Sequence, residues 1–477
     1  MSLLWTTQEM VAAMDGRPLG DLPEGVTGIS IDSRTAGPGD AFFAIKGDKF
    51  DGHDFASGAI ANGASLLVVS EAKLPALGRL IAPMIVVKDV LAALEDLGRA
   101  ARARSEARII AITGSVGKTS SKEMLRRALE PSGEVHASAA SFNNHWGVPL
   151  TLARMPESAA FGVFEIGMNH ADEIRPLVKM VKPHVAIITT IAAAHLGNFK
   201  NLTEIAAAKA EIMEGLVADG HLLLNQDNEK FGWLKKRAGA LKIAHIHGFG
   251  ENAKAVYRLL NSKLLPDCST ITARIGGDEV AVKIGAPGRH LVQNALAVLG
   301  ATHLAGADLA KAAHALAGLS AEKGRGARHR LAIDGGSFLL IDESYNANPA
   351  SMRAALELMG DMPVRLRGRR IAVLGDMLEM GKFAERVHRD LAGPIRTAKT
   401  DMVCLAGPEM KALRDELGTE IETVYRDQAE GLAEHLKSAL RDGDVVMVKS
   451  SLGIGFGQIV KALLDKFPAL PDSSTTE

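Results

Sequence analysis

The sequence predicts an α/β protein of three domains: a small α/β first domain, a central P-loop-type domain on a parallel sheet, and a C-terminal Rossmann-like, doubly wound domain. One observation is length, since 477 residues exceed what one core supports at roughly 100 to 200 residues per domain. A second is that apolar runs of strand length alternate with helical periodicity, as in parallel sheets covered by helices. A third is that basic joints at 99–108 and 322–330 divide the chain into 1–105, 106–325 and 326–477.

The composition is that of a folded protein, with 47% hydrophobic and 23% charged residues. The net charge of -1 offers no attraction to a polyanion, so we expect no nucleic-acid partner. The isolated Cys268 and Cys404 argue against a disulfide framework and a structural zinc site. No signal peptide opens the chain, and the run at 183–199 is too short and polar to span a bilayer. We therefore expect a cytoplasmic protein without stable membrane insertion.

Strand-length apolar runs account for the two larger sheets. The predicted strands are 108–113, 161–166, 185–190 and 222–225 in the central domain, and 371–374, 402–406 and 445–448 in the last. Polar residues follow several of these runs, at the carboxyl ends where open α/β sheets bind ligands. The sequence thus places the functional residues at these edges.

A glycine loop joins the strand at 108–112 to a helix at 121–130, which Pro131 stops. Its letters are T-G-S-V-G-K-T-S, so backbone N–H groups can turn toward an anion, Lys118 can reach the β and γ phosphates, and Thr119 can hold Mg²⁺. The loop is shorter than the general Walker pattern, because Ile112 occupies the first glycine position. The order strand, loop, helix predicts a bound nucleoside triphosphate contacted by Gly114, Ser115, Val116, Gly117, Lys118, Thr119 and Ser120.

Two further side chains end neighbouring predicted strands. Glu165 lies in E-I-G-M-N-H and His195 in A-A-A-H-L-G-N-F. A carboxylate suits Mg²⁺, whereas histidine is a less usual ligand for so hard a cation. Each residue alone is more often structural, but their shared edge with the glycine loop favours a metal site. Spacing alone places Lys209, in an apolar helix, on a solvated face.

These residues, in this order, resemble the Mur ligases, the cytoplasmic ATP-dependent amide ligases of peptidoglycan synthesis. The resemblance rests on T-G-S-V-G-K-T, the Glu165 and His195 segments, and the A-A-K of Lys209 followed by N-Q-D-N at 225–228. Within the family, further stretches are similar to the members that join D-alanyl-D-alanine to UDP-N-acetylmuramoyl-tripeptide. These stretches are 29–34 with 38–40 and 51–55, 143–144 before 147–150, 342–349, and 373–381.

The resemblance implies a role for each domain and a set of site residues. The domain at 1–105 would bind the UDP-substrate, 106–325 would bind ATP with two Mg²⁺ ions, and 326–477 would be the ligase domain. Lys209 would react with carbon dioxide to form a carbamate, an anionic ligand for the second Mg²⁺. The implied catalytic residues are Lys118, His195, Lys209 and Arg328, the last preferred to Arg325 by its distance to Asp342. The implied metal ligands are Thr119, Glu165, His195 and Lys209. The implied nucleotide contacts beyond the loop are His290, Asn294, Asp342, Tyr345, Asn346 and Asn348. The implied substrate contacts are Ser33, Arg34, Lys46, Asn143 and Asn144.

The implied reaction runs through an acyl phosphate on the substrate carboxylate, which the dipeptide amine then attacks, in a chain expected to be a monomer. Three alternatives stay open. A sister ligase that adds the third amino acid usually shows D-N-P-R in its last domain, and that string is absent here. Folate polyglutamate ligases share the short loop, but their chains normally begin close to it. A nucleotide-dependent switch or kinase would release phosphate without regard to a peptide acceptor.

Overall fold

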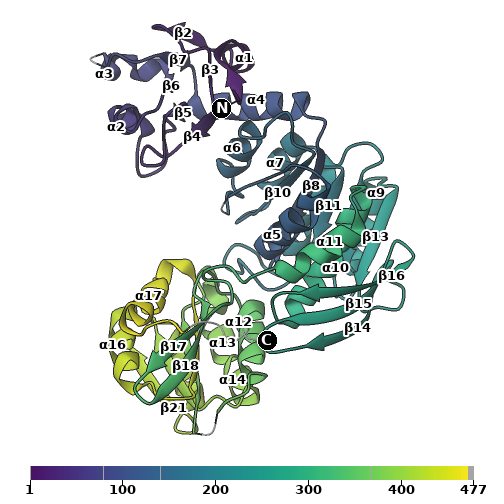
Figure 1. The fold of residues 1–477 in the computed structure, drawn as a ribbon, viewed down its shortest axis with the longest axis vertical. Coiled ribbons are helices and arrows are strands. Elements are labelled where there is room, and N and C mark those ends of the chain that lie inside the picture. Colours follow the sequence, from purple (N-terminus) through teal and green to yellow (C-terminus); the bar gives the residue numbers. More distant parts are fainter. Residues whose placement is uncertain (1, 79, 140, 366, 471–477) are drawn as a thin grey trace.

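The protein is described by a computed structural model that covers residues 2–78, 80–139, 141–365 and 367–470. Figure 1 shows three lobes that follow one another along the long axis in the order of the chain. None of the helices within these ranges is long and apolar enough to cross a membrane.

The first lobe holds a five-stranded sheet in the order β2-β7-β6-β5-β4 and a two-stranded ribbon of β1 and β3. Strands β4 to β7 are parallel, and β2 joins β7 antiparallel. Helix α4 buries Leu94 and Leu97 in the same hydrophobic cluster as Leu150 of α6, so the first two lobes share a core. The elements are β1 Trp5–Thr6, α1 Thr7–Ala13, β2 Arg17–Leu19, β3 Gly25–Val26, β4 Gly28–Ser30, β5 Asp40–Phe43, α2 Ala56–Ala61, β6 Leu66–Ser70, α3 Leu74–Leu77, β7 Met84–Val87 and α4 Val90–Arg104.

The central lobe holds a nine-stranded sheet in the order β16-β15-β14-β13-β12-β11-β8-β10-β9. Helices α5, α10 and α11 cover one face, and α6 to α9 cover the other, each with its own hydrophobic cluster. The elements are β8 Arg108–Thr113, α5 Lys118–Leu129, β9 Val135–Ala137, α6 Gly147–Ala153, β10 Phe161–Glu165, α7 Ile174–Val181, β11 Val185–Ile188, α8 Leu202–Ala210, β12 His221–Asn225, α9 Phe231–Ala240, β13 His245–Gly250, β14 Tyr257–Leu264, β15 Ser269–Ile275, β16 Asp278–Ile284, α10 Arg289–Leu304 and α11 Leu309–Ala315.

This sheet is mixed, whereas the sequence predicts a parallel one. Strand β14 is parallel to β13, but β15 and β16 continue the sheet antiparallel. The reason lies in a tight turn, because Gly276 and Gly277 both take the left-handed conformation between β15 and β16. The alternating burial along β15 is the pattern of a strand with one covered face.

The last lobe holds a six-stranded sheet in the order β17-β18-β22-β19-β20-β21. All neighbours are parallel except β17 and β18, which form a hairpin, and helices cover both faces, so the doubly wound prediction is confirmed. The elements are β17 Ala327–Ile333, β18 Gly336–Glu343, α12 Pro349–Gly360, β19 Arg370–Gly375, α13 Ala384–Arg389, α14 Ala392–Thr397, β20 Met402–Ala406, α15 Met410–Leu417, β21 Glu422–Arg426, α16 Ala429–Ala439, β22 Val445–Lys449 and α17 Gly457–Lys466.

The register of β8 with its neighbours decides where the functional side chains gather. Strand β8 pairs in parallel with β10 on one side and β11 on the other, with Ile112 opposite Glu165 and Thr113 opposite Ile188. The loop after β8 therefore begins beside the ends of both neighbours.

Candidate active site

A pocket of about 600 Å³ lies between the central and C-terminal lobes, at the carboxyl ends of β8, β10 and β18. Its wall contains the predicted residues Ser115, Val116, Gly117, Lys118, Thr119, Ser120, Asn143, Glu165, His290, Asn294, Tyr345, Asn346 and Asn348. Residues far apart in the sequence, from two domains, thus share one cavity.

The glycine loop takes the shape that an anion site requires. Gly114 and Gly117 have φ values of +155° and +85°. A Cβ at Gly117 would lie 2.6 Å from Oδ1 of Asn294, and one at Gly114 would lie 1.8 Å from Oγ1 of Thr189. Helix α5 starts directly after Gly117, so the N–H groups of its first turn lie at the pocket.

Lys118 and Glu165 provide the charges beside the loop. Nζ of Lys118 donates to the carbonyl oxygen of Gly114 at 2.9 Å. Burial lowers the pKa of Lys118, Glu165 opposes that shift, and the charge of Arg325 adds to it. Oγ1 of Thr119 donates to Oε2 of Glu165 at 2.9 Å, and Nδ2 of Asn143 donates to Oε1 at 2.7 Å. A hydroxyl and a carboxylate in contact are the hard oxygen donors that suit Mg²⁺.

Lys209 is buried, although its spacing suggests a solvated face. It belongs to α8, on the face of the central sheet that α6 to α9 cover, and its side chain is 1% exposed. Within the described part of the chain, neither a hydrogen bond nor an acidic partner is among the causes that shift the pKa of its ammonium group. Burial, with the charge of Lys118 as a smaller cause, lowers the pKa of Lys209 well below its ordinary value. The lowered pKa favours the neutral amine, which is the nucleophilic form.

His195 lies apart from the pocket wall and contacts the C-terminal domain. Its Nδ1 is 2.5 Å from Oε2 of Glu379, and this hydrogen bond lowers the pKa of Glu379. Among the residues that the structure describes, no hydrogen bond or ion pair joins His195 to Glu165 or Lys209. Nor does any group of three or more His, Cys, Asp and Glu side chains there have the geometry of a metal site.

The structure brings Arg325 to the pocket in place of the predicted Arg328. Arg325 lies in the pocket wall, with its guanidinium 4.2 Å from the ring centre of Tyr345. Arg328 is a strand residue that donates from Nη1 to the carbonyl oxygen of Pro266, and burial lowers its pKa to about 10. Arg328 therefore does not line the pocket, because the 322–326 segment folds back over the end of β18 and brings Arg325 there instead; the catalytic role implied for Arg328 stays a prediction.

Asp342 holds this fold rather than lining the pocket. Its Oδ2 accepts from the backbone N–H of Gly324 at 2.8 Å, and its Oδ1 accepts from the hydroxyl of Ser344 at 2.6 Å. The carboxylate therefore fixes the loop that carries Arg325. In the segment after β18, Oδ1 of Asn348 accepts from the N–H of Ser351 at 2.9 Å and so caps the start of α12.

The predicted substrate residues fall into two places. Ser33, Arg34 and Lys46 belong to the first lobe, where Arg34 pairs with Asp32 at 2.6 Å and its side chain is 85% exposed. Asn143 instead contacts Glu165 in the central lobe. The side chain of Asn144 caps α6, since its Oδ1 accepts from the N–H of Gly147 at 2.9 Å.

Several wall residues carry no sequence prediction of their own. They are Ser141, Thr189, Thr190, Asn225, Gln293 and Glu343. Thr189, Thr190 and Asn225 lie at the carboxyl ends of β11 and β12, so the strand-end rule could have found them. Lys449 also lies in the wall, with Nζ 3.0 Å from Oε2 of Glu343 and from the carbonyl oxygen of Asn346.

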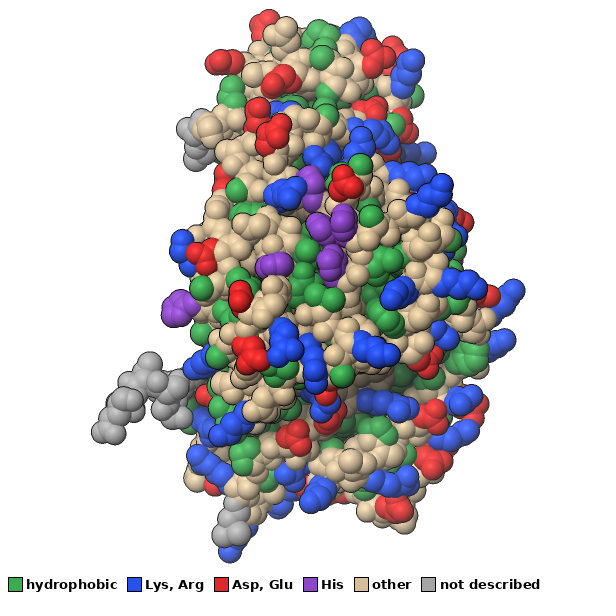
Figure 2. Space-filling model, turned by 90° about the vertical axis from the view of Figure 1, so that its right-hand side faces the viewer, with side chains coloured by type: hydrophobic (Ala, Val, Ile, Leu, Met, Phe, Trp, Pro, Cys, Tyr) green, Lys and Arg blue, Asp and Glu red, His purple; other side chains and the backbone are tan. Residues whose placement is uncertain are grey.

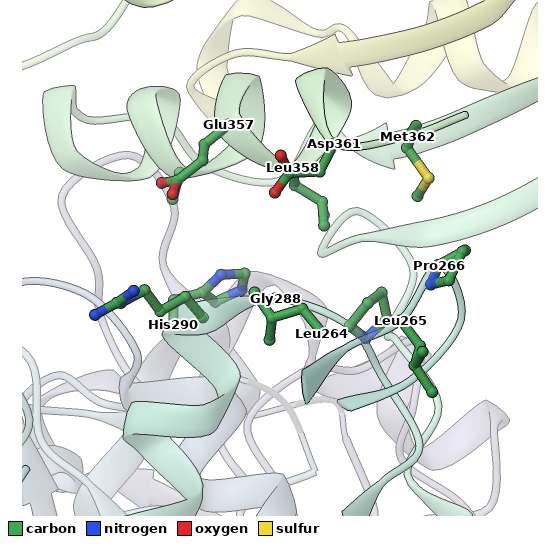
Figure 3. A pocket seen from close by; sticks show the side chains of 12 residues that line it. Leu264, Leu265, Pro266, Gly288, His290, Glu357, Leu358, Asp361 and Met362 are labelled. Carbon is green, nitrogen blue, oxygen red and sulfur yellow. The ribbon is translucent and has the colours of Figure 1, made fainter. Parts of the chain in front are cut away.

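A smaller pocket of about 160 Å³ adjoins the first and shares His290 and Ala354 with it. Figure 3 shows Glu357 and Leu358 of helix α12 above it, Met362 beyond the end of that helix, and Leu264 and His290 of the central lobe below. The two domains thus meet across an open, largely apolar gap behind the larger pocket.

A group of histidines lies on the face shown in Figure 2. His221 and His247 are 3.2 Å apart between ring nitrogens, and the ring of His245 lies 4.9 Å from that of His221. Nδ1 of His303 lies 3.3 Å from the hydroxyl of Tyr257. Burial and the neighbouring histidines lower the pKa of His247 to about 4, so its imidazole is neutral at neutral pH.

Comparisons with known proteins agree with this geometry. Three family models match in order: Mur ligase family, catalytic domain, over residues 25–102; Mur ligase middle domain, over 112–302; and Mur ligase, glutamate ligase domain, over 324–452. The UDP-N-acetylmuramoyl-tripeptide–D-alanyl-D-alanine ligase of Rickettsia prowazekii is 33% identical over 91% of this chain and 94% of its own length.

Two solved structures have the same fold. MurF from Acinetobacter baumannii superposes with a TM-score of 0.82 at 29% identity, over 97% of this chain and 99% of that one. MurF ligase from Thermotoga maritima, solved in complex with ADP, gives a TM-score of 0.77 at 23% identity, over 92% and 97% of the two chains. With the nucleotide-type loop, the two-domain pocket and these matches together, the chain belongs to the Mur ligase family.

Proposed function

We propose that this protein is an ATP-dependent amide ligase that joins D-alanyl-D-alanine to UDP-N-acetylmuramoyl-tripeptide, in the cytoplasmic synthesis of peptidoglycan precursors. The observation that carries the proposal is the shared pocket, in which the glycine loop of one domain faces Arg325 and Tyr345 of another. The Rickettsia prowazekii relative bears the name of this reaction. In this proposal the segments 1–105, 106–325 and 326–477 serve as the substrate, nucleotide and ligase domains of a monomer, with the second boundary moved to 324, where the family model of the ligase domain begins, so that Arg325 belongs to the ligase domain.

The first chemical step places the γ-phosphoryl group of ATP on the terminal carboxylate of the tripeptide. Phosphoryl transfer depends on positioning and on charge neutralisation more than on covalent catalysis. Backbone N–H groups of the loop and the first turn of α5 bind the phosphates, and Lys118 leaves the Gly114 carbonyl to reach them. Arg325 faces the same space from the C-terminal domain and neutralises charge on the transferred group.

The second step is attack of the dipeptide amine on the acyl phosphate, which forms the amide and releases phosphate. Water would hydrolyse the same intermediate, so the site must exclude it. Residues of two domains enclose the pocket, and Arg325 stacks on Tyr345 at its rim. Contact between the domains therefore both assembles the site and protects the intermediate.

Thr119 and Glu165 fit one Mg²⁺ by their chemistry, since a hydroxyl and a carboxylate already lie in contact. When bound, Mg²⁺ neutralises phosphate charge. Lys209 fits the carbamate, because its side chain is buried and its burial lowers the pKa of the amine, with no acidic partner to oppose that shift. The amine nitrogen bonds to the carbon of carbon dioxide and loses a proton, which replaces a would-be cation with an anionic oxygen ligand. Lys209 and His195 would hold the second ion.

The proposal is tested by phosphate release from the purified protein with ATP, Mg²⁺ and UDP-N-acetylmuramoyl-tripeptide, with and without D-alanyl-D-alanine. We expect phosphate release that depends on D-alanyl-D-alanine. The UDP-linked product should be heavier than the tripeptide substrate by one D-alanyl-D-alanine unit. Release that ignores the dipeptide would indicate a switch or kinase. Release that requires UDP-N-acetylmuramoyl-dipeptide and a single amino acid would indicate the sister ligase.

A further inference from the structure

Two loops from different domains meet at His195 and Glu379. The loop at 192–200 follows β11 of the central domain, and the loop at 376–381 follows β19 of the C-terminal domain. Beside the side-chain contact at 2.5 Å, the backbone N–H of Gly197 donates to the carbonyl oxygen of Glu379 at 2.7 Å. Side chain and backbone thus join the same two loops.

The backbones of these loops are shaped for the contact. His195 has a φ of +56° and Glu379 a φ of +65°, a conformation that residues other than glycine seldom adopt. A Cβ at Gly381 would lie 2.6 Å from the Cα of Gly197, so a side chain there would push the loops apart. Such conformations persist where the surroundings fix them, and they gather at functional sites.

Each loop is also held within its own domain. The N–H of Leu378 donates to Oγ of Ser451, and the N–H of Met377 donates to Nε2 of His388, both at 2.9 Å. On the other side, Nδ2 of Asn198 donates to the carbonyl oxygen of Asn169 at 3.0 Å. Glu379 is therefore presented to His195 from a fixed support.

The hydrogen bond decides which nitrogen of His195 is available. A carboxylate accepts and does not donate, so Nδ1 carries the hydrogen, and in the neutral ring the lone pair is then on Nε2. Metal-binding histidines commonly donate their other ring N–H to a carboxylate, which fixes ring orientation and raises ligand basicity. The arrangement of His195 with Glu379 has this form.

We propose that Glu379 is a positioning residue for His195. Through Glu379, the orientation of Nε2 of His195 for metal binding depends on contact with the C-terminal domain. The inference rests on the proposed metal-binding role of His195. Because Glu379 lies in another domain, Nε2 is oriented only while the two domains are in contact. Domain contact would then prepare a ligand of the central domain as well as delivering Arg325.

The test uses full-length variants whose substitutions are compatible with the backbone conformation of the loop. Glu379→Gly removes the side chain at a left-handed position that glycine adopts freely, and Glu379→Gln retains a hydrogen-bond acceptor. Glu385→Gln is the control, since Glu385 is an exposed residue of the same domain that pairs with Arg389 within its own helix. Thermal unfolding confirms that each variant is folded.

The first readout is the tautomer of His195 in metal-free protein, from ¹⁵N NMR of histidine-labelled samples. We expect a protonated Nδ1 in the wild type, in Glu379→Gln and in the control, and a mixture of tautomers in Glu379→Gly. The second readout is Mn²⁺ affinity by electron paramagnetic resonance with a non-hydrolysable ATP analogue. We expect Glu379→Gly to weaken Mn²⁺ binding roughly 10- to 100-fold, with partial recovery in Glu379→Gln.

Unchanged tautomer and unchanged Mn²⁺ affinity in Glu379→Gly would overturn the inference. His195→Ala separates this failure from that of the proposed function. If His195→Ala weakens Mn²⁺ binding while Glu379→Gly does not, the role of Glu379 alone is wrong. If His195→Ala binds Mn²⁺ as tightly as the wild type, the metal role of His195 is wrong and the inference falls with it.

Discussion

Replacing Lys209 by Met should abolish ligation and yet stabilise the protein. The side chain is 1% exposed, and burial lowers the pKa of its amine with no acidic partner to oppose the shift. Burying such a polar group costs about 1–3 kcal/mol on the scale of protein mutations. Met is unbranched, of similar length and apolar, so Lys209→Met should recover that amount while removing the proposed carbamate. Loss of turnover together with a gain of stability would show that Lys209 is kept for function at a cost in stability.

The assay is thermal unfolding in buffer depleted of carbon dioxide, beside turnover with all substrates. Each kcal/mol should raise the unfolding midpoint by about 2–4 °C for a domain of this size. Lys200→Met, at an exposed position before α8, is the matched control and should stay within about 0.5 kcal/mol of the wild type. Bicarbonate should raise the midpoint of the wild type but not of Lys209→Met, because only the lysine reacts.

The pH dependence of this stability has a definite sign. The folded pKa of Lys209 is lowered, so between that pKa and the unfolded value near 10.4 the unfolded chain binds the extra proton. Wild-type stability should therefore rise toward the stability of Lys209→Met as the pH approaches about 10. A lowered midpoint in Lys209→Met would refute the account of an unpartnered buried amine, and near-normal turnover would refute the carbamate.

Three further outcomes are expected. Lys118→Ala should lower turnover by roughly 10²- to 10³-fold with an unchanged unfolding midpoint, because one donor to the phosphoryl group is lost. Steady-state kinetics measure this effect, and a change of only a few-fold would contradict it. Arg325→Ala should lower turnover by roughly 10²-fold or more. Arg328→Ala should leave turnover within a few-fold and cost at most about 1 kcal/mol of stability, because water can replace its hydrogen bond to the exposed Pro266 carbonyl; equal kinetics in the two variants would contradict the assignment. The folded pKa of His247, about 4, lies below the ordinary value near 6.5, so stability present above pH 6.5 should fall as the pH drops to 4. The full shift is worth about 3 kcal/mol, which solvent screening at this half-buried ring reduces to roughly 1–2 kcal/mol; denaturant titrations of the wild type and of His247→Gln compare the slopes, which should be flatter in the variant.

Local patterns predicted the elements whose cause is local. The strand at 108–113 and the strand at 402–406 have the predicted bounds, since a short apolar run with both faces covered marks a central parallel strand. The hairpin strands β15 and β16 were not predicted, although the alternation of Ile271, Ala273 and Ile275 before the Gly276–Gly277 turn is itself a local hairpin signal. The grouping of the glycine loop with Glu165 follows from the parallel register of β8 and β10.

Contacts between domains were beyond sequence reasoning. His195 and Glu379 are 184 residues apart, and nothing near His195 in the sequence signals an acidic partner. Distance along the chain led to Arg328, whereas the fold-back held by Asp342 brings Arg325 to the pocket. The burial of Lys209 likewise depends on how α8 packs, and the few polar neighbours in its own helix do not reveal it.

Hydrogen bonds to the loop after β11 hold the glycine loop in place. Oγ of Ser115 donates to the carbonyl oxygen of Ala192 at 2.9 Å, and Oγ1 of Thr189 donates to that of Val116 at 2.6 Å. Asn294 closes the space beside Gly117. Little conformational entropy is then lost at the loop when phosphates arrive, beyond the swing of the Lys118 side chain. Nucleotide association at this loop should therefore behave as docking to a rigid receptor, with a rate governed by diffusion and entry rather than by loop ordering.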